Sequence, residues 1–351
     1  MRIGILTFHN IPNVGALLQA YALCLTFRSL GADCDLIDYT CSNIKERELT
    51  FHPTGNALKD LILKLFVYPK TVLKIKACQQ FMIDRRCYSN IRYTKDTLPE
   101  ANSRYDAFIS GSDMIWNLSV TDYDWTYFCD FVDDDKKKYA YGSSIGGKWA
   151  AKDIAKVKQL LSRYNMIGVR ESDTCEVLNT LGIAARNVCD PTMLLSATEW
   201  AEVAVQPREK NYVLVYFSNA ENIRAANEYA AKYGLKVLAL NLGLPIKGAK
   251  SVAPLTPQEW IGYFLYASAV FTGSFHGLLF SLYFRVPVWT DNQSNRVGSI
   301  LRKLGIEECL YRDGKWHLSY QIDFNEIKEG IEGFRRDSLS YLQDILKDIQ
   351  G

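Results

Sequence analysis

The amino-acid sequence predicts an α/β fold made of two doubly wound domains whose parallel sheets face one cleft. Short apolar segments alternate with amphipathic helical segments, which is typical of parallel sheets connected by helices. The alternation occurs twice, on either side of a polar stretch at residues 196–210 that is the expected linker. The length of 351 residues is sufficient for two domains with cores of their own.

The first set of elements opens with a strand, a helix and a second strand. Residues 3–8 are continuously apolar, as expected for a parallel strand that is buried on both faces. Asn13 is the predicted N-cap of a helix over residues 16–30, which Gly31 ends, and residues 34–37 form the second strand. The later strands of this set are expected at residues 107–110, 138–141, 166–169 and 187–190, with helices at 152–163 and 171–181.

Residues 39–104 interrupt this alternation and are expected to form a helical insertion. Apolar side chains recur there with the i, i+3, i+4, i+7 spacing of one helix face. These residues are Leu58, Leu61, Ile62 and Leu65. Lysines at positions 59, 64, 70, 74 and 76 make the same segment basic, so the pattern predicts basic, amphipathic helices.

The second set of elements follows the linker. Its strands are expected at residues 212–217, 235–240, 269–272 and 286–289, and its helices at 222–233, 258–267 and 275–284. An amphipathic helix over residues 325–349 ends the chain. We therefore expect an N-terminal domain over residues 1–195, which contains the insertion, and a C-terminal domain over residues 196–351.

Composition excludes several classes of protein. With 48% hydrophobic and 23% charged residues, the chain is expected to be globular rather than disordered. A formal net charge of +2 gives no electrostatic reason to expect a nucleic acid as partner. The nine cysteines are never spaced C-x-x-C, which favours free thiols in a reducing compartment over a zinc cluster. We expect a cytoplasmic protein, because the N-terminal apolar stretch is too short for a signal peptide.

Two known motifs partly match the segment GSSIGGKW at residues 142–149. A phosphate-binding loop of nucleotide triphosphatases needs Ser or Thr after Lys148, but Trp149 follows, so this interpretation is rejected. The G-x-S-x-G pattern around Ser144, with Asp190 and His276 later in the chain, matches the order of a serine hydrolase. The residues after Ser144 delay the helix that a nucleophile elbow requires, which disfavours this alternative without excluding it.

The segment TGSFHG at residues 272–277 has the features of an anion site. A strand that passes into a helix near Phe275 exposes backbone N–H groups and the positive end of the helix dipole. Ser274 could cap this helix and contact a phosphate oxygen. His276 would then lie beside the anion and act as a proton donor. The alternative is a packed histidine that is bonded to a backbone carbonyl.

Several short segments recur in an order that resembles the polysaccharide pyruvyltransferase family. The resemblance covers about residues 3–305 and rests on the segments GILTFHNIPNVGALLQAYAL, YDAFISGSDMIWN, KKYAYGSSIG, VRESDTCEVLNTLGI, DPTMLL, FTGSFHGLLFSLYFRVPVW and SNRVGSILRKLGI. It implies a GT-B-like fold of two Rossmann-like domains around a cleft. It also implies transfer of the pyruvyl group of phosphoenolpyruvate to sugar hydroxyls, forming a pyruvate ketal in capsule or exopolysaccharide biosynthesis, with no metal or redox cofactor.

The same resemblance suggests roles for residues that contact phosphoenolpyruvate. We expect this substrate on the side of the C-terminal domain, with Arg170 as a contribution from the N-terminal domain. His276 matches the family's histidine and is the expected general acid. Arg170 and Arg296 match arginines that would bind carboxylate or phosphate. Many relatives carry an arginine where this chain has Ser274, so Arg296 or Lys148 would supply that contact. The alternatives are an ion pair or helix cap for Arg170 and a surface position for Arg296.

The acceptor sugar is expected at strand ends of the N-terminal domain. Asn13 and Gly15 open the first helix there, and Asp113 is the expected base for the attacking hydroxyl. Further candidates for sugar recognition are His9, Asn10, Ser112 and Asn117. For His9, Asn10 and Asn117, a role as turn or cap residues is the alternative.

Three further expectations concern function and location. A nucleotide-sugar glycosyltransferase of the same architecture and a non-catalytic glycan- or anion-binding protein are the alternatives to a pyruvyltransferase. If the acceptor is carried on a lipid, residues 57–82 are expected to lie on the inner face of the membrane, although an ordinary solvated helix is the simpler alternative.

Overall fold

The computed structural model describes residues 1–217 and 219–351, and the chain divides into two compact units. Unit 1 consists of Met1–Thr50, Gln79–Leu195 and Ile331–Gly351, and unit 2 consists of Phe51–Cys78 and Ser196–Gly330. One boundary lies between residues 195 and 196, where the sequence predicted it. The units differ from the predicted domain ranges in two segments. Residues 51–78 group with unit 2 instead of the N-terminal domain, and residues 331–351 group with unit 1 instead of the C-terminal domain.

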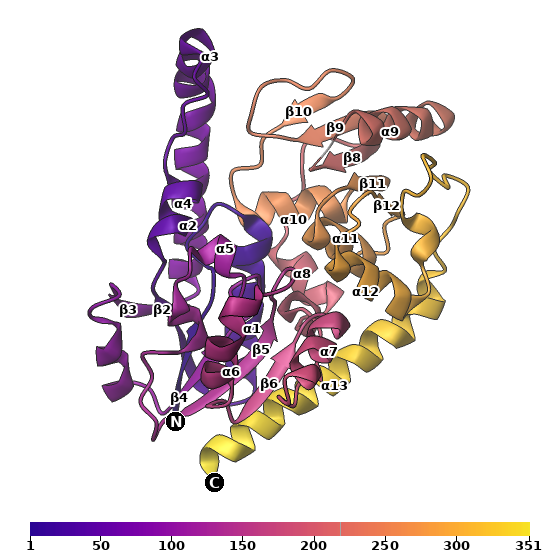
Figure 1. Ribbon diagram of the computed structural model, residues 1–351. Coiled ribbons are helices and arrows are strands. Elements are labelled where there is room, and N and C mark those ends of the chain that lie inside the picture. Colours follow the sequence, from indigo (N-terminus) through magenta and orange to yellow (C-terminus); the bar gives the residue numbers. More distant parts are fainter. Residues whose placement is uncertain (218) are drawn as a thin grey trace. The chain divides into compact units, whose positions relative to one another are not determined.

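Unit 1 is built on a seven-stranded parallel sheet with the order β3-β2-β1-β4-β5-β6-β7. The strands are β1 (Arg2–Leu6), β2 (Asp33–Asp38), β3 (Tyr88–Arg92), β4 (Ala107–Ser110), β5 (Lys137–Ser143), β6 (Met166–Val169) and β7 (Arg186–Asn187). The chain runs outward from β1 to β3 and then returns to place β4 on the other side of β1 (Figure 1). The direction of winding therefore switches between β1 and β4.

The helices of unit 1 follow its strands. They are α1 (Val14–Ser29), α2 (Ser42–Leu49), α5 (Leu118–Thr121), α6 (Ile154–Leu161) and α7 (Ser172–Thr180), with short 3-10 turns η2 (Leu98–Ser103), η3 (Trp125–Phe128), η4 (Ala151–Asp153) and η5 (Pro191–Leu194). Asn13 caps α1 as predicted, because its side chain accepts the N–H of Ala16 at 3.4 Å. α1 is buried along most of its length, which makes it part of the core of unit 1.

Unit 2 repeats this arrangement with a five-stranded parallel sheet in the order β10-β9-β8-β11-β12. The strands are β8 (Tyr212–Tyr216), β9 (Lys236–Leu240), β10 (Lys250–Val252), β11 (Ala269–Thr272) and β12 (Val288–Thr290). The helices are α8 (Ala197–Val203), α9 (Ala220–Tyr233), α10 (Pro257–Leu265), α11 (Phe275–Tyr283) and α12 (Asn295–Leu304), with the turn η6 (Glu307–Cys309). Here the winding switches between β8 and β11.

Three local expectations were wrong or incomplete. The predicted linker begins with α8, which Ser196 and Glu199 cap reciprocally. The predicted helical insertion also contains β3, which pairs with β2 and extends the first sheet. Strand β10 was not predicted, because its three residues are too few to show a periodicity.

The terminal helix α13 (Phe324–Gln350) explains why the end of the chain groups with unit 1. Tyr341 is buried and its hydroxyl donates to the carbonyl of Ala140 in β5 at 3.1 Å. The hydroxyl of Ser338 accepts the N–H of Cys189 at 2.9 Å. The amphipathic sequence pattern predicted this helix, but a pattern of that kind cannot indicate which sheet the helix will cover.

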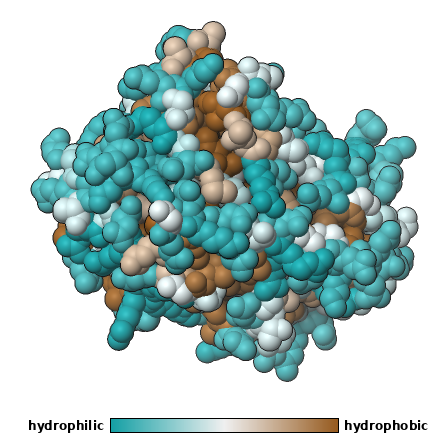
Figure 2. Space-filling view, turned by 90° about the horizontal axis from the view of Figure 1, so that it is seen from below, coloured by the Kyte–Doolittle hydropathy of each residue, from teal (hydrophilic) through white to brown (hydrophobic). Residues whose placement is uncertain are grey.

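The surface seen in Figure 2 is mainly hydrophilic, with separate hydrophobic patches between the hydrophilic residues. Among the described residues, no helix is both long enough and apolar enough to cross a membrane. All nine cysteines are free, in line with the expectation of free thiols.

Gly262 is a position where the packing of unit 2 allows no side chain. A Cβ atom added there would lie 1.8 Å from the carbonyl oxygen of Val205. We expect Gly262→Ala to lower the free energy of unfolding by at least about 2 kcal/mol, because overpacking displaces backbone. Chemical denaturation measures this change. Gly333→Ala is the control, since its Cβ would meet only the end of the Arg336 side chain at 3.9 Å. Equal effects of the two substitutions would contradict this account.

Candidate functional site

In both units, predicted site residues lie at the carboxyl ends of strands that flank the switch of winding. In unit 1, His9 follows β1 and Asp113 follows β4, and these two strands are neighbours. In unit 2, the predicted residue Ser274 follows β11, whose neighbour β8 ends at Tyr216, a residue that was not predicted. Ligands of doubly wound sheets bind at this point, because the connections diverge there and leave a crevice.

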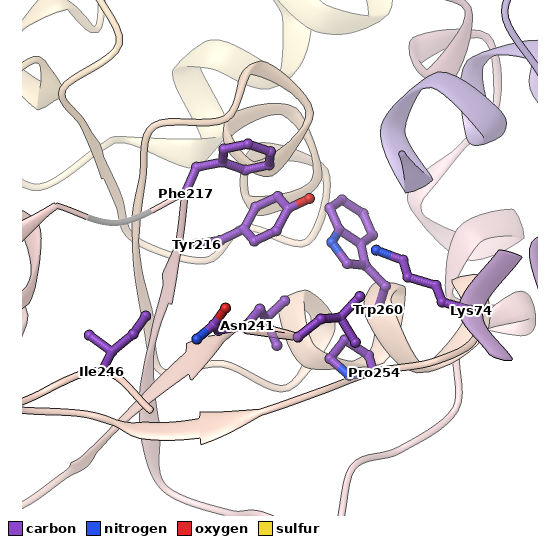
Figure 3. A pocket seen from close by; sticks show the side chains of 9 residues that line it. Lys74, Tyr216, Phe217, Asn241, Ile246, Pro254 and Trp260 are labelled. Atoms are coloured by element: carbon purple, nitrogen blue, oxygen red, sulfur yellow. The ribbon is translucent and has the colours of Figure 1, made fainter. Parts of the chain in front are cut away.

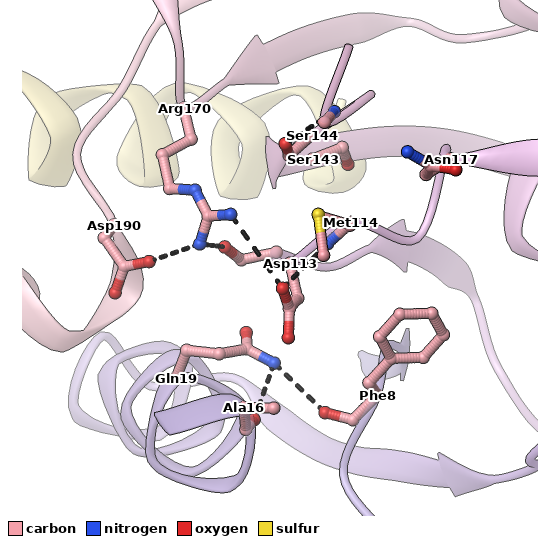
Figure 4. A network of polar contacts seen from close by, with 12 residues as sticks. Phe8, Ala16, Gln19, Asp113, Met114, Asn117, Ser143, Ser144, Arg170 and Asp190 are labelled. Carbon is pink, nitrogen blue, oxygen red and sulfur yellow. Dashed lines mark hydrogen bonds and ion pairs between the residues drawn. The ribbon is translucent and has the colours of Figure 1, made fainter. Parts of the chain in front are cut away.

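Arg170 is the centre of a buried polar network in unit 1 (Figure 4). Its guanidinium group donates to Asp190 at 2.7 Å and lies 3.3 Å from the carboxylate of Glu171. A third carboxylate, that of Asp113, lies 3.9 Å away, and the hydroxyl of Ser112 accepts at 3.4 Å. The network joins the segments that follow β4, β6 and β7.

The electrostatics of this network correspond to the structural alternative for Arg170. Burial by itself lowers the pKa of Arg170, but Glu171, Asp190 and Asp113 outweigh this effect and raise the pKa above its ordinary value. The arginine is therefore charged, and it compensates the charge of carboxylates that are themselves buried. Its role as a clamp for a substrate anion stays a prediction.

Asp113 has a strained backbone and an unusual neighbour. Its φ angle is +74°, in the left-handed region that few residues other than glycine adopt. One carboxylate oxygen accepts the N–H of Met114 at 2.8 Å, and Figure 4 shows the carboxylate directed toward the amide of Gln19 in α1. The Asp113 side chain and helix α1 therefore lie on the same side of the switch of winding in unit 1.

Gln19 is a residue that the sequence analysis missed. Its amide nitrogen donates to the carbonyls of Ala16 at 2.8 Å and Phe8 at 3.1 Å, which fixes the orientation of the amide. The buried Oε1 atom is left without a hydrogen-bond partner among the described residues. The available signal was a single polar residue within the apolar helix segment ALLQAYAL. The Gln19 amide also donates to the hydroxyl of Thr7 at 3.0 Å, and Thr7 donates to the carbonyl of Ser112 at 2.7 Å, which links Gln19 to the segment of Asp113. An unpaired buried acceptor at this place is suited to a ligand that donates, such as a hydroxyl.

The other predicted residues of unit 1 make structural contacts. His9 is buried and its Nδ1 is 2.8 Å from the carbonyl oxygen of Thr7. Asn10 accepts from Gln79 at 2.9 Å, and Asn117 caps α5 and donates to the carbonyl of Ile145 at 3.0 Å. These contacts correspond to the turn and cap alternatives. Two further predicted residues lie at the start of α1. Asn13 is its N-cap, and Gly15 is buried in its first turn.

In unit 2, the junction between β11 and α11 has the predicted strand-to-helix form. Ser274 is the N-cap of α11, and its hydroxyl oxygen accepts the N–H of Gly277 at 3.2 Å. His276 lies in the first turn of α11 with 8% of its surface exposed. The guanidinium group of Arg296, in α12, lies 5.6 Å from the centre of the Phe275 ring. The structure thus brings Ser274, His276 and Arg296 to one region of unit 2.

A pocket of about 320 Å³ lies beside this junction (Figure 3). Its lining residues are Lys74, Tyr216, Phe217, Leu240, Asn241, Leu242, Ile246, Pro254 and Trp260. Tyr216 connects the pocket to the junction, because it pairs with Thr272 and a Cβ on Gly277 would lie 3.3 Å from its ring. Burial raises the pKa of Tyr216, so its phenol is neutral at physiological pH. The sequence analysis did not identify this pocket.

Neither the phosphate-binding loop nor the serine-hydrolase pattern in residues 142–149 has its expected geometry. α6 begins at Ile154, so no sharp elbow follows Ser144, whose hydroxyl oxygen instead accepts the N–H of Gly146 at 3.2 Å. Asp190 binds Arg170 and Thr192. The described residues contain no cluster of three or more His, Cys, Asp or Glu that could hold a metal ion.

A family model described as polysaccharide pyruvyl transferase matches residues 13–290, more than three quarters of the sequence. The chain belongs to the polysaccharide pyruvyl transferase family. A comparison with curated proteins finds no match. Membership of this family confirms the resemblance seen in the sequence and makes the protein a transferase of the polysaccharide pyruvyl transferase type.

Two solved structures are similar to this chain over their whole lengths. An α-glucosyltransferase in complex with UDP is 9% identical, with 100% of each chain covered and a TM-score of 0.50. A UDP-GlcNAc 2-epimerase from Neisseria meningitidis, bound to UDP-GlcNAc, is 9% identical, with 100% of this chain and 99% of that chain covered and a TM-score of 0.49. At such low identity only the fold is compared. The glycosyltransferase, together with the two parallel sheets, confirms the predicted GT-B-like class.

The match to polysaccharide pyruvyl transferases covers most of the predicted site residues. Within residues 13–290 lie Asn13, Gly15, Ser112, Asp113, Arg170, Ser274 and His276. His9 and Arg296 lie outside this range. The match gives no residue a role, so the roles of all nine stay predictions.

Because Arg170 lies in a buried network, its substitution should destabilise the protein more than the substitution of a surface arginine. Arg170→Met should lower the free energy of unfolding by about 3–5 kcal/mol, because it leaves buried carboxylates without their counter-charge. Arg224→Met is the control, since Arg224 is exposed and pairs with Glu221 at the surface, where ion pairs contribute about 0.2–1 kcal/mol. Urea denaturation without ligand measures both. A loss of less than about 1 kcal/mol for Arg170→Met would contradict the structural role.

Proposed function

We propose that this protein transfers the pyruvyl group of phosphoenolpyruvate to sugar hydroxyls of a glycan or lipid-linked saccharide, and that it forms a pyruvate ketal. The observation that carries the proposal is the position of His276, in a chain of this family, at the start of a helix that follows a strand beside the switch of winding. We further propose that the reaction takes place in the cytoplasm as a step of cell-surface polysaccharide biosynthesis. The donor is a substrate, and the proposal includes no metal or redox cofactor.

The reaction needs one proton donor and a place for anions. Protonation of the methylene carbon of phosphoenolpyruvate makes the neighbouring carbon an oxocarbenium-like centre. A first sugar hydroxyl adds to this carbon and releases its proton. The carbon–oxygen bond to phosphate then breaks, and a second hydroxyl adds and releases its proton. The products are the ketal, which carries a methyl and a carboxylate, and inorganic phosphate.

The start of α11 supports a role in binding and protonating the donor. N–H groups in the first turn of a helix and the helix dipole favour an anion. The Ser274 hydroxyl, which accepts a hydrogen bond from Gly277, still has a proton to donate to a phosphate oxygen. Arg296 provides a positive charge near Phe275 in the same region. His276 is the group in this set that can serve as a general acid.

The switch point of unit 1 supports a role in recognising the acceptor. Asp113 can accept the proton of an attacking hydroxyl, and the unpaired Oε1 of Gln19 can accept a hydrogen bond from a neighbouring hydroxyl. Ser112 contributes a further hydroxyl next to Arg170. A cyclic ketal joins two hydroxyls of one sugar to the same carbon. Asp113 could accept the proton of one of them, and Gln19 could hold the other by a hydrogen bond.

Transfer of a sugar from a nucleotide-sugar is the second candidate. The pocket beside α11 favours it, since three aromatic side chains and Lys74 could hold a base and a phosphate. The two candidates differ in the ligand that stabilises the protein. A ligand present at about 100 times its dissociation constant adds about 2.7 kcal/mol to the free energy of unfolding. Stabilisation by UDP-sugars and none by phosphoenolpyruvate would replace the proposed reaction with glycosyl transfer.

Substitution of His276 tests the proposed general acid. We expect His276→Ala to lower kcat at least about 100-fold, because general acid catalysis contributes about 10²–10⁴-fold. The affinity for phosphoenolpyruvate should be retained. Release of phosphate with a panel of saccharides measures the rate, and deuterium in the ketal methyl group, from a reaction in D₂O, reports protonation of the methylene carbon.

His317→Ala is the matched control for this experiment, because His317 is an exposed histidine of the same unit. A fully active His276→Ala variant would contradict the role of His276. Ligand binding without turnover in the unsubstituted protein, across the saccharide panel, would favour the non-catalytic alternative.

Substitution of Asp113 tests the proposed base. Asp113→Asn should lower kcat about 100-fold and leave the affinity for phosphoenolpyruvate unchanged, because only the acceptor hydroxyl loses its proton acceptor. Steady-state kinetics with a working saccharide, together with thermal shifts by phosphoenolpyruvate, separate the two effects. Asp122→Asn is the control, since Asp122 is exposed and also has a positive φ of +51°. An unchanged kcat for Asp113→Asn would remove Asp113 from the mechanism.

A further inference from the structure

The elements α3 (Ala57–Ile62), η1 (Leu63–Val67) and α4 (Tyr68–Asp84) follow one another without a break. The residues at both joints have helical backbone angles, and the N–H of Tyr68 bonds to the carbonyl of Leu63, which makes η1 one π-helical turn. The result is one helical rod that is about 42 Å long at 1.5 Å per residue. We call this segment, residues 57–84, the rod helix.

The predicted apolar face of the rod helix is not packed against a core. Every residue from 51 to 77 is exposed or half-buried. Leu58 is 70% exposed, Leu65 60% and Phe66 64%. Leu61 and Ile62, which share the face of Leu58 and Leu65, are also exposed. A soluble helix normally buries such a stripe, so this face is suited to an apolar partner.

The charge of the rod helix indicates the chemistry of that partner. Residues 57–78 contain five lysines and one acidic residue, Asp60. Asp60 accepts the N–H and the hydroxyl of Thr54, both at 2.7 Å, so its charge is directed back to the chain that precedes the helix. Exposed leucines and a phenylalanine beside an excess of lysines are the combination that binds the interface of an anionic bilayer.

We propose that the rod helix is a docking surface for an anionic lipid bilayer. The apolar side chains of its first half insert among the lipid chains, and the lysines contact the headgroups. The same helix carries Lys74, which lines the pocket of unit 2. Docking therefore brings a headgroup-sized ligand of the membrane to the edge of that pocket. The proposal does not depend on the identity of the donor substrate.

Sedimentation of the full chain with vesicles tests the docking surface. We expect binding to vesicles of phosphatidylglycerol and phosphatidylcholine, at least about tenfold weaker binding to phosphatidylcholine alone, and weaker binding as salt increases. The triple substitution Lys59→Gln, Lys64→Gln, Lys70→Gln should weaken binding about 100-fold.

A second triple substitution is matched in charge. Lys232→Gln, Lys236→Gln and Lys247→Gln remove three exposed lysines elsewhere in unit 2. Vesicle binding by this variant should stay within about threefold of that of the unsubstituted protein. An effect of net charge alone would weaken vesicle binding equally in both triple variants. Equal losses for the two triple variants, or equal binding to neutral and anionic vesicles, would overturn the proposal.

The apolar contribution has its own test. Leu61→Glu with Leu65→Glu should abolish sedimentation with anionic vesicles, whereas Tyr233→Glu, at an exposed aromatic residue of α9, should not. Circular dichroism and thermal unfolding should show no change, since these leucines contribute to no core. Phe66→Trp supplies a positive signal, because its fluorescence should shift to shorter wavelength on anionic vesicles only.

A second copy of the chain is the alternative occupant of this face. If light scattering shows a dimer that Leu61→Glu with Leu65→Glu converts to a monomer, and vesicles do not bind, the face is a protein interface and the proposal is wrong. These experiments use no phosphoenolpyruvate and no saccharide. Their failure would therefore leave the proposed pyruvyl transfer standing, and a failure of pyruvyl transfer would leave the membrane contact standing.

Discussion

Parallel pairing of strands is the constraint on which the remaining structure depends. In a parallel sheet all strands end at the same edge, and the connections between them must return over the faces of the sheet. Where the winding reverses, two connections diverge and leave space at that edge. Each sheet of this chain has one such place, between β1 and β4 and between β8 and β11. Of the residues that the proposed reaction uses, Ser112 and Asp113 follow β4, and Ser274 and His276 follow β11.

The interior of unit 1 shows how a polar edge of this kind is stabilised. Arg170 has carboxylates on several sides and is buried with them, so its removal would leave buried carboxylates without a counter-charge. Such a network holds the ends of three strands in position and also sets the orientation of Asp113. An arginine at a strand end can therefore look like a substrate-binding residue in the sequence and still form its ion pairs with carboxylates of the protein.

In the rod helix, a sequence pattern that usually indicates burial belongs to an exposed face. Its apolar residues have the spacing that usually predicts burial, but their side chains are exposed. A single helix presents the same periodicity whether its apolar face meets a sheet, a second protein or a lipid surface, because each partner removes that face from water. The proposed lipid surface rests on the excess of lysine beside the apolar stripe, together with the exposure of that stripe.

The sequence by itself determined the class of fold, most strands and helices, the cap at Asn13 and the strand-to-helix junction at Ser274. These features are local, since periodicity, caps and glycines act over a few residues. Only the tertiary structure decided the partners of Arg170, the unpaired oxygen of Gln19 and the pocket around Tyr216 and Trp260. It also decided that the last helix packs on β5. Each of these depends on segments that are distant in the chain, and no short-range pattern records which distant segments will meet.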